Sequence, residues 1–159
     1  MATMFPESLE TADFETTGEG RVYSFLQNHA KPDQEFLVWY EPRIGDLKPD
    51  FVVYHRSVGL LILEVKDWTI GQIIDAGPRQ FTLRQGTRTV PAGNPLEQSR
   101  HYVIALIQML RNDGQLVSRD PAHKGQPRIP IVGGVVFSNI RSSEYTERHL
   151  NAVISRDLV

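Results

Sequence analysis

Residues 48–66 have the sequence KPDFVVYHRSVGLLILEVK, the most strand-like stretch of this 159-residue chain. Residues 50–55 and 59–66 are rich in β-branched and aromatic residues and flank a short turn, so they predict an antiparallel hairpin. If the turn is centred near Ser57, Asp50 lies opposite Glu64 in the ladder. The second run is apolar on both faces until Glu64, which is typical of a central strand covered on both sides.

This hairpin also gathers charged groups. Because strand side chains alternate between faces, Lys66 lies on the same face as Glu64, and Asp50 faces Glu64 across the ladder. Two opposed carboxylates destabilise a sheet unless something compensates, and a divalent cation would do so with water and phosphate as its other ligands. The alternative is that Asp50 merely begins a strand after Pro49, while Glu64 and Lys66 form a solvated pair where a core strand emerges.

The remaining elements follow from periodicity and capping signals. Outward from the hairpin, the sequence predicts a helix from about Thr17 to His29, a strand at 35–40, shorter strands forming a meander at 70–90, a long helix from Pro95 to about Arg111, a surface loop at 112–128, a buried strand at 129–137, a short helical turn at 142–150 and a final strand at 151–155. This order favours one α/β domain with a central mixed sheet flanked by helices.

Composition limits the possible functions. The chain has 17 Lys and Arg against 19 Asp and Glu, a net charge of −2, so a protein that holds nucleic acid by its overall charge is excluded. It has no Cys, which rules out disulfides and thiolate metal sites. No stretch approaches the ~20 apolar residues of a membrane span, and the N-terminus lacks a secretory signal, so we expect a cytoplasmic protein without a membrane partner.

Four motifs, in this order along the chain, resemble the nuclease-related domain, NERD, of the PD-(D/E)XK nuclease superfamily. They are GEGRVYSFL at 18–26, KPDFVV at 48–53, GLLILEVKDW at 59–68 and NPLEQSRHYV at 94–103. The resemblance covers about residues 15–137. It implies a restriction-endonuclease-like fold with a single domain, its core at about 15–140, and it favours continuation of the chain beyond Val159 into a helicase of the UvrD type.

Carried over to this sequence, the resemblance also implies a site. Asp50 and Glu64 would ligate Mg²⁺ or Mn²⁺, with the Val65 carbonyl as a third ligand and Glu19 reaching the metal directly or through water. Lys66 would orient or activate the attacking water and contact the DNA phosphate. Gln98 and Tyr102, one turn apart on a helix, would border the active site.

Several of these residues have ordinary structural alternatives. Glu19 also completes a capping box with Thr16, and the two roles do not exclude each other. Tyr102 would otherwise pack in the core while Gln98 lies at the surface. Basic side chains of the second helix and the meander either form a local phosphate-binding patch or are scattered solvated charges: Arg100, His101, Arg111, Arg79, Arg84 and Arg88.

The hairpin and the resemblance together favour a metal-dependent nuclease acting on single- or double-stranded DNA, and the resemblance implies a role in DNA processing or repair beside a helicase. The alternative is a non-catalytic module of the same fold that binds DNA or protein, and a purely structural domain comes third. The sequence contains no P-loop, no nucleophile elbow and no metal-binding histidine pair that would favour another chemistry. It leaves open the oligomeric state, the cleavage polarity and the number of metal ions.

Overall fold

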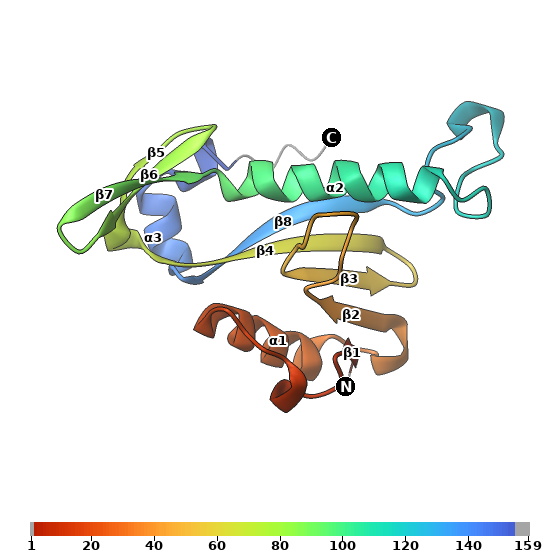
Figure 1. Ribbon diagram of the computed structural model, residues 1–159, viewed down its shortest axis with the longest axis horizontal. Helices are drawn as coiled ribbons and strands as arrows, with labels where there is room; N and C mark the ends of the chain where they lie inside the picture. Colours follow the sequence, from red (N-terminus) through yellow and green to blue (C-terminus); the bar gives the residue numbers. More distant parts are fainter. Residues whose placement is uncertain (1, 155–159) are drawn as a thin grey trace.

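A five-stranded mixed sheet forms the centre of the molecule, which we describe for residues 2–154 from a computed structural model (Figure 1). The strands lie in the order β1-β2-β3-β4-β8. Pairing is parallel for β1–β2 and β4–β8 and antiparallel for β2–β3 and β3–β4. The bounds are β1 Thr3–Phe5, β2 Phe36–Tyr40, β3 Phe51–His55, β4 Gly59–Thr69 and β8 Ile131–Asn139.

One helix covers each face of this sheet (Figure 1). Helix α1 (Thr17–His29) buries Val22 and Tyr23 against one face, together with Val65 of β4. Helix α2 (Pro95–Arg111) buries Tyr102 and Leu106 on the other face, together with strand residues such as Ile62. The apolar residues on both faces of β4 are thus explained, because its side chains pack alternately under α1 and under α2.

A second, three-stranded antiparallel sheet extends from one end of the domain (Figure 1). It consists of β5 (Ile73–Ala76), β6 (Gln80–Gln85) and β7 (Arg88–Gly93) in that order. Its inner side chains, among them the fully buried Phe81, pack with the start of α2 and with the segment after α3 (Ser142–Glu147). The meander predicted from sequence is therefore confirmed as a separate small sheet.

The β3–β4 hairpin has the register that the sequence predicts. Phe51 pairs with Leu63, and continuing this register by one residue places Asp50 beside Glu64. Both long helices and the strands at 36–40 and 131–139 also occur where they were predicted, within a few residues. The mixed α/β class, with a central mixed sheet flanked by helices, is confirmed.

The predicted final strand at 151–155 is wrong for its described residues. A 3-10 helix spans Leu150–Ala152, and the Ile154 N–H donates to the Leu150 carbonyl. Leu150 and Ile154 are both buried against the small sheet, so their spacing of four brings them to one side of a helical turn. Ser155 lies outside the described residues. Strand β1 was not predicted, because its three residues are too few to show a period.

The loop between α2 and β8 contains one 3-10 turn, Pro121–His123, and a single bridge between Val117 and Pro127. It extends past the end of α2 (Figure 1). No helix in the part of the chain described is long and apolar enough to cross a membrane.

Candidate metal and phosphodiester site

Asp50 and Glu64 come together where β3 begins beside the middle of β4. The Asp50 carboxylate accepts a 2.6 Å hydrogen bond from the Val65 N–H, which fixes it against the neighbouring strand. Glu64 is 2% exposed, among the most buried polar side chains described. The cost of burying a carboxylate so completely indicates that this position serves more than packing.

Lys66 lies on the same face of β4 and is bound to this pair. Its Nζ donates to Glu64 Oε1 at 2.5 Å and lies 5.9 Å from the centre of the Trp68 ring. Glu64, Lys66 and Trp68 alternate along one face of β4, so the strand itself sets their spacing. The lysine predicted as part of the site is therefore in contact with one of its two carboxylates.

Both carboxyl groups of the pair have raised pKa values. Burial and the neighbouring Glu64 charge raise the pKa of Asp50 to about 7, against a partial lowering by the Val65 N–H. Burial also raises the pKa of Glu64, although Lys66 opposes that shift. A divalent cation would favour the ionised form of both carboxyl groups and would relieve the repulsion between them.

The donor set suits a hard cation such as Mg²⁺ or Mn²⁺. Glu64 Oε2 is buried without a hydrogen-bond partner, so one oxygen is available as a ligand. The Val65 N–H points toward Asp50, and since the N–H and C=O of a strand residue face the same edge, its carbonyl does too. No group of three or more acidic or histidine side chains suited to a metal occurs within residues 2–154, so water and phosphate would complete the coordination.

Glu19 approaches the pair from α1, on the other face of the sheet. Its charge is close enough to raise the pKa of both Asp50 and Glu64. Its own oxygens are occupied, because Oε2 accepts from the Tyr40 hydroxyl at 2.7 Å and from the Glu15 N–H at 3.1 Å. Oε1 accepts from Thr16, whose hydroxyl in turn caps α1 by accepting the Glu19 N–H.

The predicted capping role of Glu19 is confirmed, and its predicted contact with a metal stays a prediction. It belongs to the N-terminal cap of α1, and it adds negative charge beside the carboxylates. The hydrogen bonds to its oxygens would have to open for it to bind a metal directly, whereas contact through water would leave them in place.

Gln98 and Tyr102 stack one turn apart on α2, as their spacing predicts. Gln98 Nε2 donates to the Tyr102 hydroxyl at 2.8 Å. Tyr102 is buried, and after burial itself the charges of Glu64 and Asp50 contribute to raising its pKa. The pair thus lies on the face of the sheet that carries the carboxylates, and Tyr102 is part of the core at the same time.

Arg100, which was predicted together with Lys66 to contact DNA phosphates as part of a local basic patch, is exposed and ion-paired with Glu97 on the same helix. Arg111 donates to Gln126 at 2.6 Å. Both arginines of α2 therefore already have partners on their own surface.

A residue that sequence reasoning missed is Asp67, which lies directly after Lys66. Its carboxylate accepts from the Gly18 N–H at the start of α1, at 2.9 Å, and from the Ser138 hydroxyl. Its carbonyl accepts from Asn139, which is also bound to Arg21 at 2.7 Å. Asp67 therefore ties the first turn of α1 to β4 and β8 beside the site. Only its position after the E-x-K motif hinted at this role.

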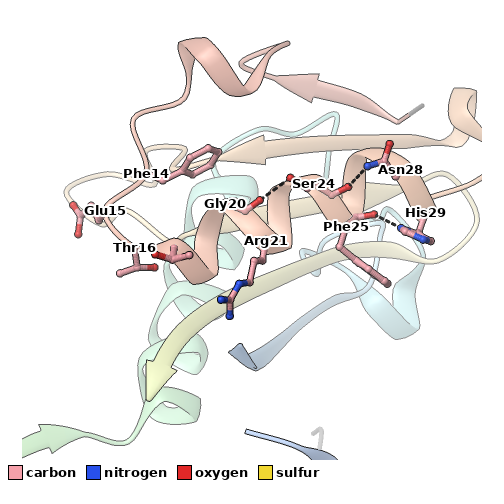
Figure 2. Close-up of a pocket in the computed structure, with 10 residues that line it drawn as sticks. Phe14, Glu15, Thr16, Gly20, Arg21, Ser24, Phe25, Asn28 and His29 are labelled. Carbon is pink, nitrogen blue, oxygen red and sulfur yellow. Dashed lines mark hydrogen bonds between the residues drawn. The ribbon is translucent and has the colours of Figure 1, made fainter. Parts of the chain in front are cut away.

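A shallow pocket of about 800 Å³ lies elsewhere, along the outer face of α1. Figure 2 shows that its walls include Arg21, Ser24, Phe25 and His29. None of the carboxylates at the centre of the sheet lines it. The candidate chemistry is thus located at a strand junction and not in this pocket.

The five-stranded mixed sheet, its two covering helices and the acidic residues on adjoining strands define a nuclease-like α/β domain. Residues 15–138 match the family model described as the nuclease-related domain, NERD. Since this match covers most of the chain, the protein belongs to that family. No curated protein and no solved structure matches the chain.

Proposed function

We propose that this domain is a divalent-metal-dependent nuclease that hydrolyses phosphodiester bonds of DNA. The observation that supports it best is the pair of carboxylates, Asp50 and Glu64, held side by side with the Lys66 ammonium 2.5 Å from one of them. Acidic pairs beside a lysine, on a nuclease-related fold, suit phosphodiester hydrolysis. Membership of the NERD family agrees with this assignment.

In this proposal Asp50, Glu64 and the Val65 carbonyl hold Mg²⁺ or Mn²⁺. When bound, the cation supplies a Lewis acid and a water of lowered pKa. Its charge would also favour the ionised form of both acids, whose pKa values are raised without it. Glu19 adds negative charge from α1. It would contact the metal through water, or directly after losing its present hydrogen bonds.

Lys66 has a different role from the acids, because an ammonium group is no metal ligand. It would donate to the water or to a phosphate oxygen, with Glu64 and the Trp68 ring holding its position. Gln98 and Tyr102 would orient the substrate from α2, and Arg100 would contact the DNA backbone after leaving Glu97.

A non-catalytic module that binds DNA or protein is the second candidate. It is favoured by the lack of a three-residue acidic or histidine cluster in the described chain and by the tight pairing of Lys66 with Glu64. In that case the buried acids would be retained without turnover. Binding of DNA without any cleavage, in Mg²⁺ and in Mn²⁺, would distinguish it from the nuclease.

Metal-induced stabilisation tests the assignment of the acids. A cation at 100 times its Kd stabilises the folded state by about 2.7 kcal/mol, or roughly 5–10 °C in Tm for a chain of this size. We expect this gain with Mg²⁺ or Mn²⁺ in the wild type and little of it in Asp50→Asn or Glu64→Gln. Differential scanning fluorimetry with and without the metal measures it.

The variant Lys66→Ala distinguishes the chemical step from metal binding. Lys66→Ala should keep most of the metal-induced gain in Tm but lose cleavage of labelled DNA by at least ~100-fold, since its charge acts on the reacting groups. Lys124→Ala, which removes an exposed lysine from the loop after α2, is the control and should change neither measurement. If Asp50→Asn retained both the metal response and full cleavage, the site would have to lie elsewhere.

For biological context, we propose DNA processing or repair beside a helicase of the UvrD type in the same chain. This proposal rests on the family resemblance of the motifs and not on the described residues. A full-length reading frame without a P-loop downstream would overturn it.

A further inference from the structure

The end of the β6–β7 hairpin, residues 84–89, is the most cationic projection of the small sheet. Its sequence is RQGTRT, all six residues are exposed, and it contains no acid. The whole chain has a net charge of −2, so this segment differs in sign from the molecule that carries it. We call residues 84–89 the hairpin tip.

Neither arginine of the hairpin tip has a hydrogen-bonding or ion-pair partner in the described part of the chain. In residues 2–154, Arg84 and Arg88 have no side-chain hydrogen bond and no ion pair, whereas Arg21, Arg100 and Arg148 all have partners. Unpaired guanidinium groups are available for phosphates, which they bind in a bidentate manner.

The tip is a two-stranded ribbon on a rigid base. Strand β5 pairs with β6 only as far as Leu83, so beyond that residue the strand partner of β6 is β7. Below the tip, Phe81 and Leu83 are buried in the core of the small sheet. The turn is closed by Gly86 at φ +61°, a conformation that favours glycine.

Alternation along the strands places the two arginines on opposite faces of this ribbon. Phe81 and Leu83 point inward, so Arg84 points outward with Thr82. Arg88 pairs with Gln85 and shares the face of Leu83. The ribbon therefore presents one guanidinium to each side, and further hydrogen-bonding groups come from Thr89 beside Arg84, Gln85 beside Arg88 and Thr87 in the turn.

We propose that the hairpin tip inserts into the major groove of B-form duplex DNA, with Arg84 and Arg88 bound to the phosphates of the two opposite walls. The major groove is about 12 Å wide and admits a two-stranded ribbon. The deep, narrow major groove of A-form RNA does not admit side chains in this way. The inference rests on the proposed function for the choice of nucleic acid as partner.

The tip is also coupled to the candidate site through a short chain of contacts. Trp68, two residues after Lys66, packs its ring 5.5 Å from that of Phe81 in β6. The small sheet is thus fixed to the strand that carries Lys66. A duplex held by the tip would keep a defined orientation relative to Glu64 and Lys66.

Fluorescence anisotropy with a labelled DNA duplex, in Ca²⁺ in place of Mg²⁺, tests the proposal. The double variant Arg84→Ala/Arg88→Ala should bind at least ~10-fold more weakly at 0.1 M salt. The negative slope of log K against log salt should become shallower by about 1.8. Its Tm should match the wild type because both side chains are exposed. Arg84→Lys/Arg88→Lys should recover most of the affinity, since it restores the charges.

The matched control is Arg119→Ala/Lys124→Ala, which removes the same charge from the exposed loop beyond α2 (Figure 1). It should bind DNA within about twofold of the wild type. Any one of four results would overturn the inference: the two double variants lose equal affinity, the tip variant binds as the wild type does, an RNA duplex binds as tightly as the DNA duplex, or the wild type does not bind DNA. If the wild type bound DNA through the tip but did not cleave it, only the proposed nuclease activity would be refuted. If the wild type cleaved DNA and the tip variant bound it unchanged, only the proposed role of the hairpin tip would be refuted.

Discussion

Asp50 is the residue at which the electrostatics of the site can be measured directly. Its pKa in the folded chain is about 7, raised first by burial and then by Glu64. In the unfolded chain an aspartate titrates near 3.9. The folded state therefore binds more protons between these values, and the contribution of Asp50 to stability is lost as the pH rises toward 7.

Removing this charge should stabilise the metal-free protein in a pH-dependent way. Asp50→Asn keeps an oxygen that can accept the Val65 N–H and loses the ionisation. In EDTA, we expect its Tm to exceed that of the wild type by ~5 °C more at pH 8 than at pH 5, equivalent to about 1–2 kcal/mol. A Tm difference that stayed constant or shrank with pH would contradict the raised pKa of Asp50.

The sequence was informative at these positions because the register of a tight hairpin follows from its turn. Asp50, Glu64 and Lys66 could be brought together by counting from Ser57, and the structure places them so. Asp67 could not be recognised in this way, since its partners Gly18 and Ser138 lie 49 and 71 residues away in the chain. Contacts of that kind depend on the docking of whole elements.

At the scale of elements, the start of α1 is fixed by one glycine. A Cβ on Gly18 would overlap the Asp67 carboxylate and lie 2.5 Å from Ser138 Oγ. Gly18→Ala should therefore push α1 from the sheet or break its bond to Asp67, and we expect a loss of about 1–3 kcal/mol. Thermal unfolding would show this as a Tm lowered by ~3–10 °C.

The control for that prediction lies two residues further along the same helix. A Cβ on Gly20 would be 3.6 Å from the Phe14 ring, an ordinary contact. Gly20→Ala should raise stability by roughly 0.5–1 kcal/mol, because alanine loses less backbone entropy in a helix. If both variants moved Tm in the same direction, the tight packing of Gly18 on Asp67 would not be what limits this position.

Elements with strong periodicity were predicted well, and short ones were not. The two long helices and the β3–β4 hairpin each repeat their pattern often enough to be recognised. The prediction for the segment after α3 was wrong because Leu150 and Ile154 fit a strand and a helical turn about equally well until the small sheet is present to bury them. Tertiary packing decided that choice, as it commonly does for short apolar runs.

At the scale of the whole molecule, charge limits how the protein can hold DNA. With a net charge of −2, binding has to come from a few local contacts such as the hairpin tip and Lys66. Each phosphate neutralised contributes about 0.9 to the slope of log K against log salt. Three or four contacts therefore give a slope near −3, shallower than that of proteins with a basic surface.

This predicts how the wild type should respond to salt. Between 50 and 200 mM salt, a fourfold change, three or four contacts lose roughly 40- to 150-fold in affinity, while six to ten contacts lose 10³- to 10⁵-fold. Anisotropy titrations of a labelled duplex in Ca²⁺ at several salt concentrations give the slope. A slope steeper than about −5 would mean six or more ion pairs. The phosphate-binding surface would then have to extend beyond the hairpin tip, Lys66 and Arg100, onto further basic residues such as Arg111, which is paired with Gln126 in the free protein.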